Sequence, residues 1–282
     1  MSQPRPCSVP LTGIYSAPIH QFKQWIKFIG TALLATTFAV SSQAEIWSST
    51  EVHYSKGDLL NPFAKKDFDT TIITLQHAGG HKYGNNFFFV DHSRTKDSGT
   101  EFYGEWYSTF SLGAITGNDM SFGMVKDVGL LAGFNFATSV DKMILLPGVS
   151  LALDLPGFAF ANLDITGYNH LTTKLNDKEE ETSYMIDFNW AYPFKMAGGS
   201  CSLEGHAEYI AGRDVINSDG SKGTPVEDWN LMQPQLRFDL GEALGNDAGN
   251  FFVGIEYQYW KNKLGVKDQN ESTVQLQTVW NF

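Results

Sequence analysis

The last twelve residues of the chain, ESTVQLQTVWNF (271–282), alternate between apolar and polar side chains up to the final residue. One face of this segment carries Phe282, Trp280, Thr278, Leu276 and Val274. The other face carries Asn281, Gln277 and Gln275, and Val279 breaks the alternation. Because successive side chains of a strand point to opposite faces, this segment requires an apolar medium on one side and water on the other. A strand of this kind must pair with the first strand, so that no edge stays exposed.

The same alternation recurs in about a dozen segments, which are separated by turns rich in Gly, Asn, Asp and Ser. They span residues 47–54, 69–78, 83–92, 101–111, 128–137, 147–155, 158–168, 183–194, 200–211, 229–240, 250–260 and 271–282. The first segment alternates only weakly. A tilted membrane crossing needs about 9–11 residues, so twelve crossings and their turns account for the chain after residue 44. We therefore predict an all-β fold in which residues 45–282 form a transmembrane, antiparallel, up-and-down β-barrel of twelve strands.

The N-terminal residues 1–44 have the three parts of a bacterial export signal. Three basic residues precede the apolar stretch FIGTALLATTFAV (28–40), and no acidic residue occurs before Glu45. Small residues follow, with Ser42 and Ala44 at the two positions that a signal peptidase inspects. We expect a signal peptide that is cleaved after Ala44, and export to the outer membrane of a Gram-negative cell.

The polar faces of the predicted strands carry ionisable residues near the middle of the strand. These are Asp91, Glu105, Asp164, Asp187, Glu204 and Glu256. The apolar faces often carry aromatic residues towards the strand ends, as interfacial girdles of membrane barrels do. A soluble exported β-sandwich with a solvated polar face is the alternative fold. The barrel explains both features together, with an acidic lumen inside and lipid outside.

Charge, cysteine content and motifs exclude several classes of function. The formal net charge is −11, whereas binding a nucleic-acid polymer requires a basic surface. Cys7 lies in the predicted leader, so Cys201 is left without an intramolecular disulfide partner. The sequence has no Gly-x-Ser-x-Gly, no His-Glu-x-x-His and no phosphate-cradling glycine loop. We therefore predict no catalytic residue, no cofactor and no resident metal ion.

Four stretches of the chain resemble the nucleoside-specific channel-forming family of outer-membrane proteins, the Tsx and OmpK-like group. They are KYGNNFFFVD (82–91), NDMSFGMVKD (118–127), LDLPG (153–157) leading into NLDITGY (162–168), and the terminal VWNF (279–282). The resemblance extends over essentially the whole chain after the leader. It implies a monomeric barrel of twelve strands in the outer membrane, with lipopolysaccharide and lipid around it. It also implies a narrow lumen that conducts nucleosides passively.

The chemistry of a nucleoside suggests which inward residues contact it. A flat base stacks on aromatic rings, and the hydroxyls of a ribose donate to carboxylates and amides. A pore also needs several weak sites, because one tight site would prevent release. The predicted lumenal ligand-binding residues are Phe87, Phe89, Asp91, Tyr103, Glu105, Tyr107, Asp164, Asp187, Arg237 and Glu256.

Several alternatives stay open at this level. Asp91 and Glu105 could instead form bridges across the lumen to Arg237 or Lys126, because small barrels fill their interiors with side chains. Arg237 could build a network with the acidic residues, and His206 lies between Glu204 and Glu208 at a spacing that also suits a metal ion. A closed structural or adhesion barrel, or an outer-membrane barrel enzyme, are the alternative functions. We expect the charged stretch at residues 176–182 to be a solvated turn.

Overall fold

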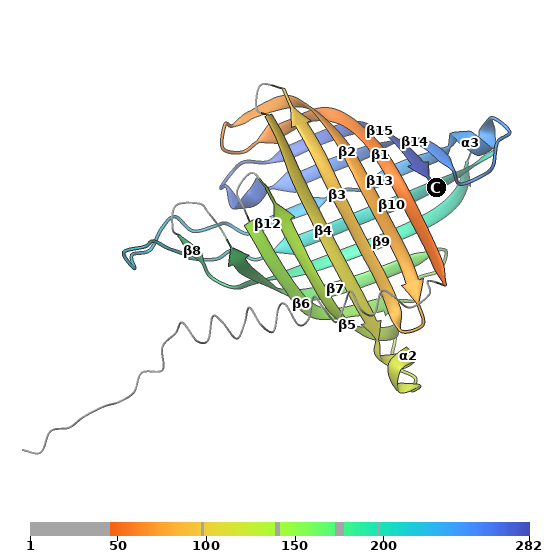
Figure 1. Ribbon diagram of the computed structural model, residues 1–282, viewed down its shortest axis with the longest axis horizontal. Coiled ribbons are helices and arrows are strands. Elements are labelled where there is room, and N and C mark those ends of the chain that lie inside the picture. Colours follow the sequence, from red (N-terminus) through yellow and green to blue (C-terminus); the bar gives the residue numbers. More distant parts are fainter. Residues whose placement is uncertain (1–45, 97–98, 139–141, 173–177, 197) are drawn as a thin grey trace, which may run out of the picture. The chain divides into compact units, whose positions relative to one another are not determined.

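The computed structural model describes residues 46–96, 99–138, 142–172, 178–196 and 198–282, and the predicted leader lies outside the described residues (Figure 1). The strands are β1 (Trp47–Asn61), β2 (Lys66–His81), β3 (Gly84–Thr95), β4 (Gly99–Ser111), β5 (Val125–Ala137), β6 (Lys142–Leu153), β7 (Phe160–Thr172), β8 (Glu179–Glu180), β9 (Ser183–Met196), β10 (Gly199–Ile210), β11 (Val215–Ile216), β12 (Trp229–Met232), β13 (Gln235–Asp239), β14 (Phe251–Lys261) and β15 (Glu271–Asn281). The helical elements are α2 (Leu112–Thr116), α3 (Leu240–Ala243) and the 3-10 turn η1 (Lys263–Gly265).

The sheet closes on itself. The last strand, β15, pairs with β1 in antiparallel register, with Val52 opposite Trp280, and β9 pairs with β10 on the other side of the ring. Both β12 and β13 lie between β10 and β14, so together they form one interrupted strand. Within the described residues this gives the predicted antiparallel barrel of twelve strands, and Figure 1 shows the strands tilted around a common axis. The predicted pairing of the two terminal strands is confirmed.

The side-chain pattern is inverted relative to that of a water-soluble protein. Large apolar side chains are exposed on the outer faces of nearly all the long strands, namely Tyr54, Ile73, Phe102, Leu130, Val149, Ile165, Ile186, Leu203, Leu236, Ile255 and Leu276. Polar side chains are buried on the inner faces, namely Ser55, Thr70, Asn135, Ser150, Thr166, Asp187, Arg237, Glu256 and Gln275. Soluble proteins rarely expose so continuous an apolar surface, whereas a membrane barrel requires lipid outside and polar groups inside.

The first strand is longer than its weak sequence pattern predicts. It runs over fifteen residues, from Trp47 to Asn61, instead of over residues 47–54. Its buried inward positions include His53 and Ser55, and its outward face mixes Tyr54 with the charged Lys56. Because polar residues occur on both faces, the period of two is hard to recognise in the sequence.

The segment 229–240 is also different from the single strand that its alternation predicts. Proline has no N–H to donate to a sheet ladder, and Pro234 interrupts the strand between β12 and β13. The Pro234 carbonyl still accepts a backbone hydrogen bond from Tyr257, so the two pieces stay in line. Residue 240 already begins α3.

The barrel has two distinct ends. The terminal end, as we call it, is where β1 begins and β15 finishes. The loop end is opposite, and it carries residues 178–182 and the long connection at residues 211–228, which contain β8 and β11. Aromatic pairs mark both ends of the outer surface, with Phe251 against Trp280 at the terminal end and Tyr184 against Tyr209 at the loop end. Among the described residues, no helix has the length and apolar character needed to cross a membrane.

Candidate lumenal site

The ten predicted lumenal residues all belong to the inward faces of the barrel strands. They are Phe87, Phe89 and Asp91 on β3, Tyr103, Glu105 and Tyr107 on β4, Asp164 on β7, Asp187 on β9, Arg237 on β13 and Glu256 on β14. They do not form one cluster. Instead they belong to an aromatic wall, a facing wall of amides and acids, a pair of carboxylates on β7 and β9, and a bridge near the terminal end. Binding of a solute by these residues stays a prediction.

The aromatic wall is built by β3 and β4, which are adjacent strands. The ring centroids of Phe87 and Phe89 are 6.1 Å apart, and those of Phe89 and Tyr103 are 6.0 Å apart. Both pairs are tilted, which is a favourable geometry for aromatic rings. At Gly133 on β5, a Cβ atom would lie 2.5 Å from the Tyr107 ring, so glycine is what allows that ring to approach the neighbouring strand. The wall therefore gathers several aromatic rings on one side of the lumen.

Glu105 is held by its neighbours rather than left free in the lumen. The hydroxyls of Tyr103 and Tyr107 both donate to its carboxylate, the latter at 2.9 Å. The Asn135 amide donates to the same carboxylate at 3.0 Å. A carboxylate has about four acceptor positions, so roughly one remains for a solute hydroxyl. Glu105 therefore fixes the two tyrosine rings first and can contact a solute second.

The facing wall is a chain of amides and acids on β12 to β15. The Gln233 amide nitrogen donates to Gln258 at 2.9 Å and to Glu256 at 3.3 Å. Glu256 also accepts from Gln235 and from Gln275, each at 2.7 Å. Such a wall offers both donors and acceptors, as a polyhydroxylated solute requires.

Asp164 and Asp187 lie opposite each other on neighbouring strands. Two carboxylates in register on one face repel each other unless a donor separates them. The Asn189 amide supplies that donor, because its nitrogen lies 2.9 Å from an Asp164 oxygen and 3.0 Å from an Asp187 oxygen. Asn162 in turn donates to the Asn189 carbonyl at 2.9 Å, which fixes the orientation of that amide.

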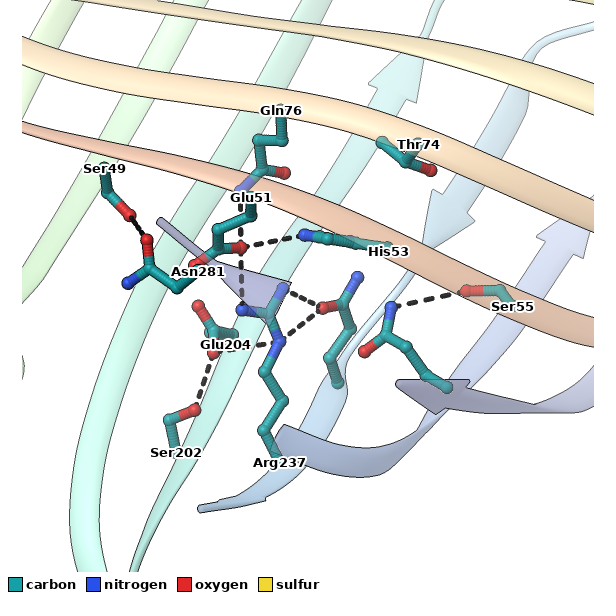
Figure 2. A network of polar contacts seen from close by, with 12 residues as sticks. Ser49, Glu51, His53, Ser55, Thr74, Gln76, Ser202, Glu204, Arg237 and Asn281 are labelled. Carbon is teal, nitrogen blue, oxygen red and sulfur yellow. Dashed lines mark hydrogen bonds and ion pairs between the residues drawn. The ribbon is translucent and has the colours of Figure 1, made fainter. Parts of the chain in front are cut away.

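Arg237 forms a bridge across part of the lumen near the terminal end (Figure 2). Its guanidinium lies 3.1 Å from a Glu51 carboxylate oxygen on β1 and 3.2 Å from Glu204 on β10. Two strands, β14 and β15, separate β13 from β1 along the sheet. The contact between Arg237 and Glu51 therefore crosses the lumen instead of joining adjacent strands. Figure 2 shows His53 and Gln76 approaching the same Glu51 carboxylate, and their distances are 2.8 Å and 3.3 Å.

These contacts correct the bridges that the sequence suggests. Asp91 accepts a hydrogen bond from Thr74 at 2.6 Å, and no ion pair joins it to Arg237 among the described residues. Lys126 is exposed and is not a lumenal partner of Glu105. The Arg237 network does include Glu204, but Asp164 and Asp187 belong to the Asn189 group instead. Sequence reasoning missed Glu51 and His53, because the first strand alternates too weakly to assign its inward face.

The loop-end half of the lumen is apolar on one side. Ile144, Leu146, Met185 and Ile210 point inward from β6, β9 and β10 and are almost fully buried. Tyr168 and Trp229 pack against them, with ring centroids 6.0 Å apart. Tyr107 of the aromatic wall packs against this apolar layer.

Arg213 covers the apolar layer at the loop end. Its guanidinium carbon lies 5.1 Å from the centroids of both the Tyr168 and the Trp229 rings, within cation–π range. It also forms an ion pair with Glu180 on β8, with its Nε 2.7 Å from the carboxylate. The Glu180 side chain is 19% exposed in this ion pair with Arg213, which we call the clasp, and it departs from the expected solvated turn. Residues 178, 179, 181 and 182 are exposed, as expected, and residues 176 and 177 lie outside the described residues.

The charge of Glu180 is held by neighbouring cations. Burial alone would raise its pKa, but the charges of Lys142 and Arg213 outweigh that effect and hold the pKa below its ordinary value of 4.5. Lys142 lies 3.7 Å and His170 lies 3.0 Å from the same carboxylate oxygen. The clasp therefore ties two connections together. Glu180 lies in the connection before β9, and Arg213 lies in the connection after β10.

One group in the lumen has the donor types of a metal site. It consists of Asp187, His206 and Glu208, and their ligand atoms all lie within 4.8 Å of one another. This differs from the triplet that sequence spacing suggests, because Glu204 accepts from Ser202 at 2.6 Å and pairs with Arg237 instead. Asp187, from the neighbouring strand, completes the group.

Comparison with known proteins identifies a family relationship. The family model described as "Nucleoside-specific channel-forming protein, Tsx" matches residues 43–281. No curated protein sequence matches the chain. Among solved structures, the chain is similar to "KdgM porin in complex with disordered oligogalacturonate", with 8% identity, a TM-score of 0.45, and coverage of 83% of this chain and 99% of that chain. It is also similar to the translocator domain of the autotransporter NalP from Neisseria meningitidis, with 8% identity, a TM-score of 0.41, and coverage of 93% and 98%.

Proposed function

Since the chain belongs to the nucleoside-specific channel-forming family, it is an outer-membrane channel for small solutes, and we propose that the solutes it selects are nucleosides. Movement through the lumen is passive diffusion between weak sites, without an energy source. The family relationship points to transport rather than catalysis. The proposal includes deoxynucleosides, because the lumenal groups described above do not depend on a 2′-hydroxyl.

The observation that supports nucleosides most directly is that an aromatic wall faces a polar one. Phe87, Phe89 and Tyr103 present rings to which any base can stack, at about 1–3 kcal/mol per base in single-strand binders. Across the lumen, the Gln233 and Glu256 side chains offer amides and carboxylates to sugar hydroxyls. A solute with one flat aromatic ring and one polyhydroxylated ring matches both walls at once.

A planar-bilayer experiment tests this proposal. Thymidine and adenosine at millimolar concentration or below should reduce the single-channel current, whereas ribose or sucrose at the same concentration should not. Phe89→Ala should weaken the block by thymidine by at least about 5-fold, because roughly 1 kcal/mol of stacking is lost. The matched control is Phe88→Ala on the outer face of the same strand, which should leave the block unchanged.

Two results would contradict the proposal. One is a conducting channel that nucleosides do not block. The other is equal weakening by Phe89→Ala and Phe88→Ala, because the effect would then not come from the lumen.

The proposal extends to the maturation and surroundings of the protein. We expect signal peptidase to remove residues 1–44, the barrel to act as a monomer, and its outer apolar surface to contact lipid and lipopolysaccharide. Intact mass measurement of the protein from outer membranes should give a chain that begins at Glu45. A retained leader would contradict the predicted cleavage site.

A closed structural barrel is the second candidate, because the Arg213 cover and the apolar layer beneath it narrow the loop end. In that case the purified barrel would insert into bilayers without producing current steps. Arg213→Ala would then open a current that the unmodified protein lacks. A current in the unmodified protein excludes this candidate.

A further inference from the structure

Three side chains with metal-binding donors converge from two neighbouring strands of the barrel. Asp187 on β9 lies directly opposite Glu208 on β10, and His206 shares the inward face of β10. Their donor atoms lie within 4.8 Å of one another. The His206 side chain is 31% exposed, which allows an ion in the lumen to reach it.

We propose that Asp187, His206 and Glu208 form a site for a divalent transition-metal ion, with Zn²⁺ as the ion that fits best. The site lies on the wall of the solute pathway. This proposal does not depend on nucleoside transport, because binding of the ion requires only the folded barrel.

The neighbouring amide fixes which nitrogen of His206 faces the other two ligands. The Gln233 amide nitrogen donates to Gln258 and Glu256, so its oxygen points to His206 Nε2 at 2.8 Å. Because an amide oxygen only accepts, Nε2 carries a hydrogen. The Nδ1 atom, 3.1 Å from an Asp187 oxygen, is therefore the nitrogen that an ion would take, and binding would release to solvent the hydrogen that Nδ1 shares with that carboxylate. Metal-bound histidines typically donate their other N–H to such an acceptor.

The two carboxylates are also oriented from outside the group. Asn189 donates to Asp187 Oδ2 at 3.0 Å, which leaves Oδ1 facing the imidazole. The Trp229 indole N–H lies 3.4 Å from Glu208 Oε1, so Glu208 Oε2 can turn towards the group. Each of the three ligands thus has an outer partner that limits its rotation, which is how ligand sets of metal sites are positioned.

The donor set decides between metals. Three protein ligands with a further position open to water is the ligand count of catalytic zinc sites, and zinc accepts both imidazole nitrogen and carboxylate oxygen as donors. Calcium and magnesium ions prefer all-oxygen ligand sets. Ligands at about 2.1 Å from a zinc ion lie roughly 3.4 Å apart, so binding must draw the three side chains closer together. The long side chain of Glu208 can provide most of that movement.

Zinc binding to the purified, folded barrel tests the site, with the protein produced without a polyhistidine tag. In detergent micelles, competition with a fluorescent zinc indicator should show one saturable site. His206→Asn and Glu208→Gln should each weaken that site at least about tenfold, because a three-ligand site loses one ligand. The matched control is His92→Asn, since His92 lies on the outer face of β3 against Phe102. It should bind zinc as the unmodified protein does, and MgCl₂ should not compete.

A second measurement keeps the test decisive if a variant folds poorly. Heat-modifiable migration on gels identifies the folded barrels, and zinc should raise the unfolding temperature of the unmodified protein but not of either site variant. The proposal is overturned by the absence of stoichiometric zinc binding to the folded, unmodified protein. Equal zinc affinity in His206→Asn and the unmodified protein overturns it as well. Neither readout uses nucleosides, so failure of nucleoside selectivity would leave the binding result intact.

Discussion

Replacing Arg237 with methionine should destabilise the barrel by about 3 kcal/mol, which is the lower end of the range for removing one partner from a buried ion pair. The Arg237 side chain is 5% exposed, and it neutralises Glu51 and Glu204 at 3.1 Å and 3.2 Å. Methionine fills a similar volume, but it leaves two lumenal carboxylates without their cation. We take the lower end because Glu204 is 25% exposed, so lumenal water can solvate it in part.

Reversible urea unfolding in detergent micelles or liposomes, followed by tryptophan fluorescence, measures this loss. The double variant Arg237→Met with Glu51→Gln should recover about 1–2 kcal/mol, because one of the unpaired charges is removed with the arginine. The matched control is Lys56→Met, which breaks an ion pair to Asp69 of similar length, 3.2 Å, where both side chains are about half exposed. Exposed pairs contribute roughly 0–1 kcal/mol, so this variant should unfold close to the unmodified protein. Equal losses in Arg237→Met and Lys56→Met would refute the reasoning.

Further predictions concern the lipid-facing surface, the clasp and the aromatic wall. Leu276→Arg, at a position 70% exposed on the outer face of β15, should reduce the free energy of folding into liposomes by about 2–4 kcal/mol if it lies near the bilayer midplane. The corresponding change at Ser272, closer to the loop end, should cost about 0–1 kcal/mol, and the opposite order would contradict the placement of the membrane. The pKa of Glu180 is lowered in the folded state, so its contribution to stability is present above the ordinary value of 4.5 and is lost as pH falls through the lower, folded value. The difference in unfolding temperature between the unmodified protein and Glu180→Gln should therefore be constant near neutral pH and disappear on acidification below 4.5, and a difference that persists there would contradict the clasp. Gly133→Ala should displace the Tyr107 ring and change the nucleoside block, and an unchanged block would contradict the role of that ring.

The alternation of the strands made the barrel predictable, because the period of two is imposed by lipid on one side and a polar lumen on the other. It was sufficient to place Phe89, Glu105 and Glu256 on inward faces. The alternation could not identify the partners of these residues, because contacts across the lumen join strands that are far apart in the sequence. The contact between Arg237 and Glu51 spans 186 positions, and only the closed ring brings these residues together.

Other features were hidden because local chemistry masked them. The inward face of β1 carries His53 and Ser55, but the outward face of β1 also carries polar residues. The difference in polarity between the two faces, from which a strand is recognised, is therefore small. Glu180 lies in a charged stretch that is typical of a solvated turn, and its ion pair depends on Arg213 from a different connection. Asp187 joins His206 only through strand pairing, so spacing along one strand suggested Glu204 in its place.

The central claim is that a closed barrel carries nucleosides through its lumen, and liposome swelling tests it most directly. Liposomes containing the purified protein should swell faster in isotonic thymidine than in an isotonic disaccharide. The Phe89→Ala variant should reduce that preference. Swelling in thymidine at the rate of protein-free liposomes would contradict the account.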